Sequence, residues 1–286
     1  MGSLRNGLSW PQWEEGRRSQ NSSHFGRTSK LLAQDSVPTL DRVHTRLVIE
    51  PVGQPLLEFT TYTQLLLAIR EAIKGNIFLI GIASLLTVVG HKYMYTKHSV
   101  LHRDVSYGNI LLLPAPAHGM LIDFDMATFT DRSGHSARRR TGTFDFMAAD
   151  ILVGDTNHTV RHDLESFFYV LLWIAICFSR YDGKMSARRS PYPETIFLLK
   201  TTDNQRITMS GFARCGMMWN HQRFENGILP TLDPDAKDAL GTLFLDWREA
   251  LYPEETASQD TADDPEELYM RVLKILEKTI RQLQGQ

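Results

Sequence analysis

Two carboxylates and one amide, closely spaced around two apolar runs, are the side chains of this sequence best suited to chemistry. Asp104 and Asn109 stand before the apolar run 110–113, and Asp123 follows the apolar run 120–122. Both runs have the length of short strands, and a turn containing Pro and Gly joins them. A hairpin of this kind brings the three side chains to one edge of a sheet. Their oxygens could hold a divalent cation and an attacking hydroxyl there.

The motifs around these residues resemble those of protein kinases. Residues 102–104 read His-Arg-Asp, and Asn109 follows after four more residues, which is the kinase catalytic-loop pattern. Residues 123–125 read Asp-Phe-Asp and match the metal-binding Asp-Phe-Gly pattern at two of three positions. Each motif alone occurs by chance, but their order, their spacing and the adjacent strands make the combination specific.

A closer similarity is to the fungal-type protein kinase family. It rests on five stretches in this order: HTRLVIEPVGQPLLEF, VLHRDVSYGNILL, GMLIDFDMA, RTGTFDFMAADIL and RHDLESFFYVLLWI. The resemblance extends from residue 42 to residue 180 and is weaker in the C-terminal third. It implies an α+β kinase-like fold, mainly the helical C-terminal lobe with a remnant of the small lobe. It also implies phosphoryl transfer from ATP, with Mg²⁺, to a protein substrate that it does not identify.

The resemblance assigns roles in the catalytic loop. Asp104 would orient the attacking hydroxyl and accept its proton, and Asn109 and Asp123 would bind magnesium with their oxygens. His102 would pack under the loop, and Arg103 would pair with a phosphate or another anion on the activation segment.

Two further residues are expected to support this loop. Asp163 would accept hydrogen bonds from the loop backbone and would also cap its own helix. Ser106 stands where serine/threonine kinases usually carry a lysine, and a hydroxyl cannot supply that charge. A small residue at this position resembles the catalytic loop of tyrosine kinases. The loop therefore does not decide between Ser/Thr and Tyr substrates.

The activation segment is expected to span residues 123–150. Gly142 and Thr143 occupy the Gly-Thr position, and Asp150 stands at the glutamate of the Ala-Pro-Glu position, with Arg248 as its expected partner. Thr141 is a candidate phosphorylation site after a run of three arginines, and its phosphate would pair with Arg103. The alternative is an unmodified, solvated basic loop. Ser133 and Ser136 are further candidate phosphorylation sites.

The chain is expected to begin with a disordered tail, residues 1–41, because this stretch is polar and has no sustained periodicity. The kinase-like domain would follow over residues 42–286. Residues 42–60 would form a small-lobe strand (46–50) and the hinge, and residues 61–286 would form the large lobe. Helices are predicted at 62–74 and 162–178 and after the Asp264-Pro265 cap, from apolar spacing and capping residues.

Two departures from the family stand out. No G-x-G-x-x-G occurs before Arg46, and Lys30 is the only lysine there, so the phosphate-binding loop and strand lysine of kinases are not found. The apolar run 77–89 interrupts the helix expected before the catalytic loop. At thirteen residues it is shorter than the roughly 20 that span a bilayer, which favours a buried helix over a membrane anchor. A third hypothesis is inserted sequence such as a translated intron.

These departures leave three functional classes open. The first is an active protein kinase. The second is a weak or inactive pseudokinase, or a truncated module, that only binds partners. The third is a small-molecule phosphotransferase of kinase-like fold, because in such enzymes the metal loop also reads Ile-Asp-Phe/Trp-acidic, as residues 122–125 do. The Gly-Thr segment argues against the third class.

Composition limits the partners and the compartment. The chain has 286 residues, 42% of them hydrophobic and 22% charged, which is typical of a globular protein. A formal net charge of −2 gives no electrostatic reason to expect binding to nucleic acid or to an anionic membrane. Two isolated cysteines do not make a disulfide framework, so we expect an intracellular protein, cytoplasmic or nuclear.

Overall fold

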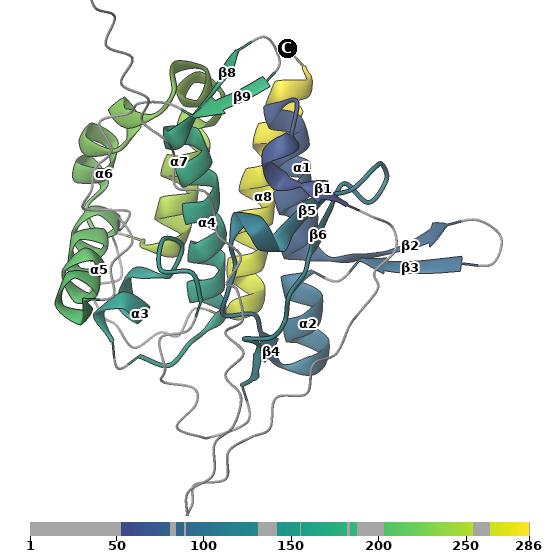
Figure 1. Cartoon of the computed structure of the whole chain (residues 1–286), viewed down its shortest axis with the longest axis horizontal. Helices are drawn as coiled ribbons and strands as arrows, with labels where there is room; N and C mark the ends of the chain where they lie inside the picture. Colours follow the sequence, from purple (N-terminus) through teal and green to yellow (C-terminus); the bar gives the residue numbers. More distant parts are fainter. Residues whose placement is uncertain are drawn as a thin grey trace, which may run out of the picture. The chain divides into compact units, whose positions relative to one another are not determined.

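The computed structural model describes residues 53–80, 84–88, 90–130, 142–154, 156–181, 184–187, 203–253 and 264–285 (Figure 1). All described residues lie within residues 49–286. The predicted tail, the strand predicted at 46–50, and Thr141 with the three arginines before it lie outside the described residues.

Helices make up most of the described residues. They are α1 (Tyr62–Lys74), α2 (His91–His98), α3 (Ala149–Val153), α4 (Val160–Cys177), α5 (Asn204–Met218), α6 (His221–Gly227), α7 (Pro234–Leu251) and α8 (Pro265–Gln284). Short 3-10 turns stand at Leu56–Glu58, Tyr107–Asn109 and Leu229–Thr231. No described helix is both long enough and apolar enough to cross a bilayer.

The described strands are short, and all their pairings are antiparallel. One sheet has the order β1-β5-β6, made of Gln54–Pro55, Ile110–Leu112 and Gly119–Leu121. Three further pairs are β2 (Asn76–Ile80) with β3 (Ser84–Val88), β4 (Val100–Leu101) with β7 (Thr128–Phe129), and β8 (Phe178–Tyr181) with β9 (Lys184–Ala187). The described residues therefore combine helices with small antiparallel sheets, as the predicted α+β class requires.

The hairpin predicted around the candidate site is present. Strands β5 and β6 pair with Ile110 opposite Leu121 and Leu112 opposite Gly119. The side chains of Ile110, Leu112 and Leu121 are buried because the sheet packs against α1. This register places the residues before β5 and after β6 at the same end of the hairpin.

Helix α4 is the centre of the core. It is buried along almost its whole length, as its sequence predicts; Arg161, Trp173 and Cys177 are its partly exposed members. A capping box begins it, in which Thr159 and His162 each bind the other's backbone amide. Phe168 packs edge-on against Phe244 and Trp247 of α7, so α4 and α7 share one aromatic layer.

Helices α1 and α8 close the other side of this core. Helix α1 has the predicted bounds, with Thr61 accepting a hydrogen bond from the Gln64 amide at its start and Gly75 at its end. Helix α8 begins at the predicted Asp264 cap, where the carboxylate accepts from the Glu266 amide. The apolar faces of both helices are buried where they contact each other.

The apolar run 77–89 does not form the buried helix that its composition favoured. It lies in the β2–β3 hairpin, with Asn76 paired to Val88 and Ile80 to Ser84. The run is rich in β-branched residues and contains Gly81, which together favour a hairpin over a helix. Figure 1 shows the hairpin projecting from between α1 and α2.

The two ends of this hairpin touch. A Cβ placed on Gly90 would overlap the backbone of Gly75 and would lie 2.9 Å from the Glu71 carbonyl oxygen. Only glycine permits so close an approach of two backbones. Because Gly75 ends α1 and Gly90 is the residue before α2, the chain leaves and re-enters the fold at one point.

Candidate active site

The backbone of residues 102–103 is held by one buried carboxylate. Asp163, in the first turn of α4, is fully buried and accepts from the amide of His102 at 2.9 Å and from that of Arg103 at 3.0 Å. These are the hydrogen bonds that the sequence predicted for Asp163. Arg103 adopts a left-handed backbone (φ 67°), so the loop turns sharply immediately before Asp104.

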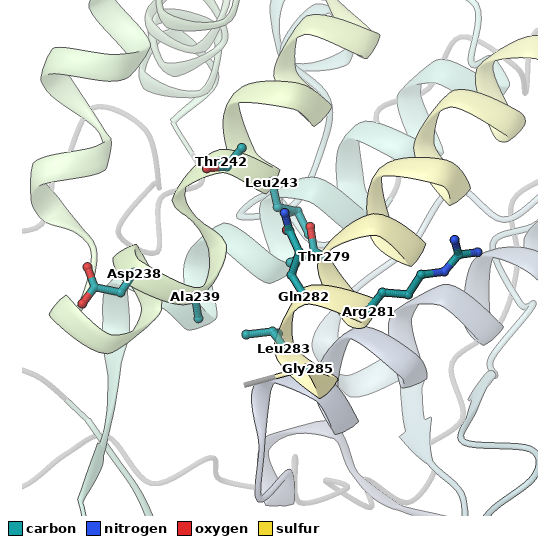
Figure 2. Close-up of a pocket in the computed structure, with 9 residues that line it drawn as sticks. All are labelled: Asp238, Ala239, Thr242, Leu243, Thr279, Arg281, Gln282, Leu283 and Gly285. Carbon is teal, nitrogen blue, oxygen red and sulfur yellow. The ribbon is translucent and has the colours of Figure 1, made fainter.

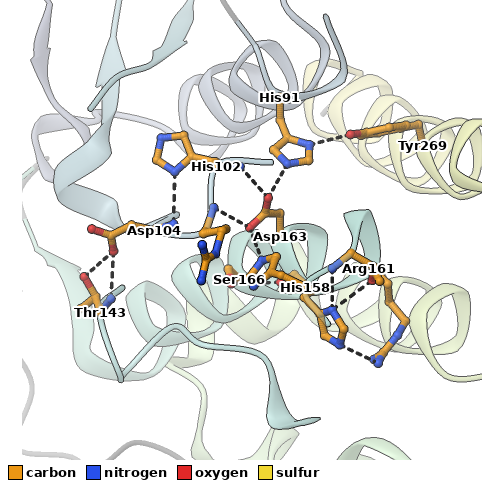
Figure 3. A network of polar contacts seen from close by, with 12 residues as sticks. His91, His102, Asp104, Thr143, His158, Arg161, Asp163, Ser166 and Tyr269 are labelled. Carbon is orange, nitrogen blue, oxygen red and sulfur yellow. Dashed lines mark hydrogen bonds and ion pairs between the residues drawn. The ribbon is translucent and has the colours of Figure 1, made fainter. Parts of the chain in front are cut away.

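Two histidines hold the Asp163 carboxylate in turn (Figure 3). His91 Nε2 lies 2.6 Å from one oxygen, and His158 Nε2 lies 2.7 Å from the other. The Tyr269 hydroxyl of α8 binds the second ring nitrogen of His91 at 2.6 Å. Burial by itself raises the pKa of Asp163, but the charges and hydrogen bonds of His158 and His91 hold it well below its usual value. The carboxylate therefore stays ionised inside the core.

His102 links the catalytic loop to the segment that carries Asp123. Its Nε2 lies 3.0 Å from the Ile122 carbonyl oxygen, and its ring packs edge-on against Phe124, with centroids 4.7 Å apart. Burial lowers the pKa of His102, which favours the neutral ring. The position under the loop agrees with the structural role expected for this residue.

Asp104 faces Thr143 from the activation segment. One carboxylate oxygen of Asp104 accepts from the Thr143 amide at 2.8 Å and from its hydroxyl at 2.9 Å (Figure 3). Gly142 makes this contact possible, because its φ is 112° and a Cβ there would lie 2.5 Å from the Arg103 carbonyl oxygen. The structure thus brings Asp104, Gly142 and Thr143 together.

Asn109 and Asp123 lie at the common end of the β5–β6 hairpin. The Asn109 side-chain amide donates to the Asp104 carbonyl oxygen at 2.8 Å, and the Asn109 carbonyl accepts from the Ile122 amide at 2.9 Å. The first contact leaves the Asn109 side-chain oxygen as an acceptor. Ser106 is buried, and its carbonyl accepts from the Asn109 amide. The catalytic loop thereby fixes Asn109 beside the residue that precedes Asp123.

The donor set suits a hard cation. Asp123 is exposed, has a left-handed backbone (φ 63°), and accepts from the Asp125 amide at 3.3 Å. Its carboxylate and the Asn109 amide oxygen are ligands of the kind that Mg²⁺ takes, with water or phosphate oxygens completing the shell. No group of three or more His, Cys, Asp or Glu side chains poised for a metal occurs among the described residues. A magnesium ion here would therefore depend on oxygens from its nucleotide and from water.

Asp150 pairs with Arg161, not with Arg248 as predicted. The Arg161 guanidinium contacts the Asp150 carboxylate directly, and His162 Nε2 lies 3.8 Å from the same oxygen. His162 and Arg161 hold the pKa of Asp150 well below its usual value. Arg248 is buried in α7 and donates instead to the Met218 carbonyl at 2.7 Å and to Glu249. Arg161 is nearer to Asp150 in the sequence, and it lies one turn before Glu165, which binds the amide of Ala149 next to Asp150.

Several residues that support the site have no sequence motif to mark them. His91 of α2 and His158, just before α4, bind Asp163, and Tyr269 of α8 binds His91. Arg214 of α5 binds backbone carbonyls of the activation segment. The sequence feature that could have indicated them is a polar residue within or beside an apolar stretch. A histidine two residues after the apolar run, and an arginine inside the Gly/Met-rich run of α5, each need a buried partner.

A cavity of about 440 Å³ between α7 and α8 is not part of this site. Asp238, Thr242, Thr279 and Arg281 are among its lining residues (Figure 2). No described residue of the catalytic loop or of the activation segment lines it.

Comparison with known proteins places these motifs in a family. The family model described as fungal protein kinase matches residues 1–175, which begins before the residue 42 at which the motif resemblance starts. The interferon-induced, double-stranded RNA-activated protein kinase of Mus musculus is 38% identical over 65 residues, 23% of this chain. The L-type lectin-domain containing receptor kinase I.3 of Arabidopsis thaliana is 37% identical over 83 residues, 29% of this chain.

The aligned regions cover only 12% of each of these two relatives, so they bear on the kinase motifs and not on the whole proteins. The family match, in contrast, extends over more than half of the 286 residues. The chain therefore belongs to the fungal protein kinase family.

Proposed function

We propose that this chain transfers the terminal phosphoryl group of Mg-ATP to a serine, threonine or tyrosine hydroxyl of a protein, on a kinase-like fold. The observation that carries the proposal is the placement of Asp104. Its carboxylate stands on a loop anchored from below by Asp163, it contacts Thr143 on one side, and Asn109 binds its backbone on the other.

Each residue has a task in this reaction. Asp104 orients the incoming hydroxyl and accepts its proton as the new bond to phosphorus forms. Asn109 and Asp123 supply oxygens to magnesium, which neutralises phosphate charge when it is bound. Arg103 would pair with an anion on the activation segment, such as a phosphate on Thr141. The carboxylate of Asp163 contributes by fixing the backbone that carries Asp104.

A second candidate is a module that binds partners without turnover. It is favoured by the lack of a G-x-G-x-x-G pattern and of any lysine other than Lys30 before Arg46. The missing lysine contact would remove electrostatic stabilisation of a kind that is worth roughly 10²–10³ in rate in other enzymes. The two candidates differ in one measurable property, which is affinity for Mg-ATP.

Calorimetry with Mg-ATP tests the proposal. We expect binding by the whole chain, at least ten-fold weaker binding by Asp123→Ala, and unchanged binding by Asp246→Ala, whose exposed carboxylate pairs with Lys278. Transfer to a mixed Ser/Thr/Tyr peptide library should then fall by about 10²–10⁴ in Asp104→Ala. No binding at millimolar Mg-ATP would overturn the kinase proposal for this chain and leave the binding module.

A further inference from the structure

Arg214 is a buried cation far from the catalytic loop in sequence. It lies on α5, has no exposed surface, and its guanidinium carbon stands 4.6 Å from the centre of the Tyr169 ring of α4. A cation over an aromatic face is stabilised by the ring quadrupole, more strongly where water is excluded. Tyr169 thus covers one face of the guanidinium. The nitrogens at the edge of the guanidinium remain directed at the activation segment.

That edge binds backbone. Arg214 Nη2 donates to the carbonyl oxygen of Asp145 at 2.9 Å and to that of Phe144 at 3.4 Å, and Nη1 donates to the carbonyl oxygen of Met147. Three carbonyls within four residues are therefore held by one planar fork. Lysine, with its single nitrogen, cannot reproduce this geometry.

The same segment continues to the catalytic aspartate. The Phe146 amide donates to the Thr143 carbonyl at 2.9 Å, and Thr143 donates twice to the Asp104 carboxylate. At the other end, the Ala149 amide donates to the buried Glu165 carboxylate at 2.9 Å. Residues 143–149 are thus tied to Asp104 at one end and to α4 at the other, and Arg214 holds the middle.

We infer that Arg214 is a positioning residue of the phosphotransfer site, which holds residues 144–147 by their carbonyls and thereby keeps Thr143 against Asp104. The segment next to Asp104 is then a preformed edge, along which an extended protein segment can present its hydroxyl. This inference rests on the proposed function for its catalytic consequence, while the positioning itself is a property of the fold.

Amide hydrogen exchange tests the positioning without any need for activity. In Arg214→Met we expect amides 143–149 to exchange at least ten-fold faster, while those of α8 keep their rates. Arg214→Lys should give an intermediate increase, and it serves as the second variant if the methionine variant does not fold. Arg206→Met, on the same helix with a side chain that is 76% exposed, should change nothing.

Transfer kinetics separate this role from general stability. We expect Arg214→Lys to lower kcat for the mixed peptide library at least ten-fold with the Mg-ATP dissociation constant unchanged within two-fold. Its effect should also be less than additive with that of Thr143→Val, because both act through the same contact with Asp104.

Unchanged exchange in residues 143–149, or an increase shared equally by α8, would overturn the inference. If the whole chain transfers no phosphate but exchange behaves as expected, the proposed function fails and the positioning by Arg214 stands.

Discussion

The catalytic loop and the β2–β3 hairpin lie on either side of α2 in the sequence, but they differ in how they are attached to the rest of the structure. The loop is tied to α4, to the 122–124 segment and to the activation segment by hydrogen bonds of its own backbone and side chains. Strands β2 and β3 pair with each other and with no other described strand. The two segments thus differ in how many separate elements hold them.

This difference shows that apolar composition does not identify the segments on which a fold depends. The run 77–89 is among the most apolar of the sequence, and it leaves and re-enters the fold at two touching glycines. The catalytic loop is polar, and its anchor is a single ionised aspartate with partners from three elements. Changes to the anchor should therefore have large effects and changes to the hairpin small ones.

The largest effect is expected from Asp163→Ala. The substitution leaves the His102 and Arg103 amides and the two histidines without their buried acceptor, which typically costs about 3–5 kcal/mol of unfolding free energy. Urea denaturation followed by far-UV circular dichroism measures this loss. Asp163→Asn keeps the shape and one acceptor oxygen, so we expect a smaller loss. A loss below about 1 kcal/mol in the alanine variant would show that the loop does not depend on this carboxylate.

The next effect is a dependence of stability on pH through His162, which neighbours Asp163 on α4. Burial, with a smaller contribution from the Arg161 charge, lowers the pKa of His162 to about 4, from 6.5 in an unfolded chain. Between these values the unfolded chain binds a proton and the folded chain does not. Stability must therefore fall as the pH falls from about 6.5 to about 4, by up to roughly 3 kcal/mol.

His162→Gln isolates this contribution. The glutamine oxygen can still accept from the Thr159 amide and keep the capping box, but it does not titrate. The difference in unfolding free energy between the parent chain and the variant should change across pH 6.5 to 4. A difference that stays constant would contradict a depressed pKa for His162.

A smaller effect is expected from Tyr269→Phe, at the outer end of the anchor. The change removes the hydroxyl that binds His91 and leaves a buried ring nitrogen without that partner, which costs about 1–3 kcal/mol. Tyr95→Phe is the matched control, because this ring packs 6.3 Å from Tyr269. Thermal unfolding of both variants gives the comparison. Equal shifts would mean that the hydroxyl contact with His91 contributes nothing specific.

Much of this arrangement could be predicted from the sequence because its signals are local. The bounds of α1, the burial of α4 and the cap of α8 follow from apolar spacing and from residues such as Asp264. The β5–β6 hairpin follows from two strand-like runs and a turn, and it fixes where Asn109 and Asp123 lie. The family resemblance then added the roles of Asp104 and Asp163.

What could not be predicted depends on partners that leave no sequence pattern. Arg214 binds carbonyl oxygens, and every residue has one, so nothing in the sequence marks residues 144–147 as its targets. The arginine chosen for Asp150 was wrong because both Arg161 and Arg248 stand in helices and only the packing of α3 on its neighbours decides between them. The hairpin was predicted to be a helix because short apolar runs fit either structure.

The smallest effect is expected from removing the hairpin. Deleting residues 76–90 would join Gly75 directly to His91, and the contact between Gly75 and Gly90 shows that these ends already lie together. Helix α1 would then run on into α2, as the helix before the catalytic loop does in the family resemblance. We expect the deletion to leave the unfolding free energy unchanged or higher, within about 1 kcal/mol, and to leave Mg-ATP affinity unchanged. Deleting an equal length from α8 is the control and should prevent folding. A deletion variant that unfolds would show that the fold depends on the hairpin. Transcripts are a separate test: if some lack the 45 nucleotides that encode the 15 residues 76–90, the hairpin is inserted sequence.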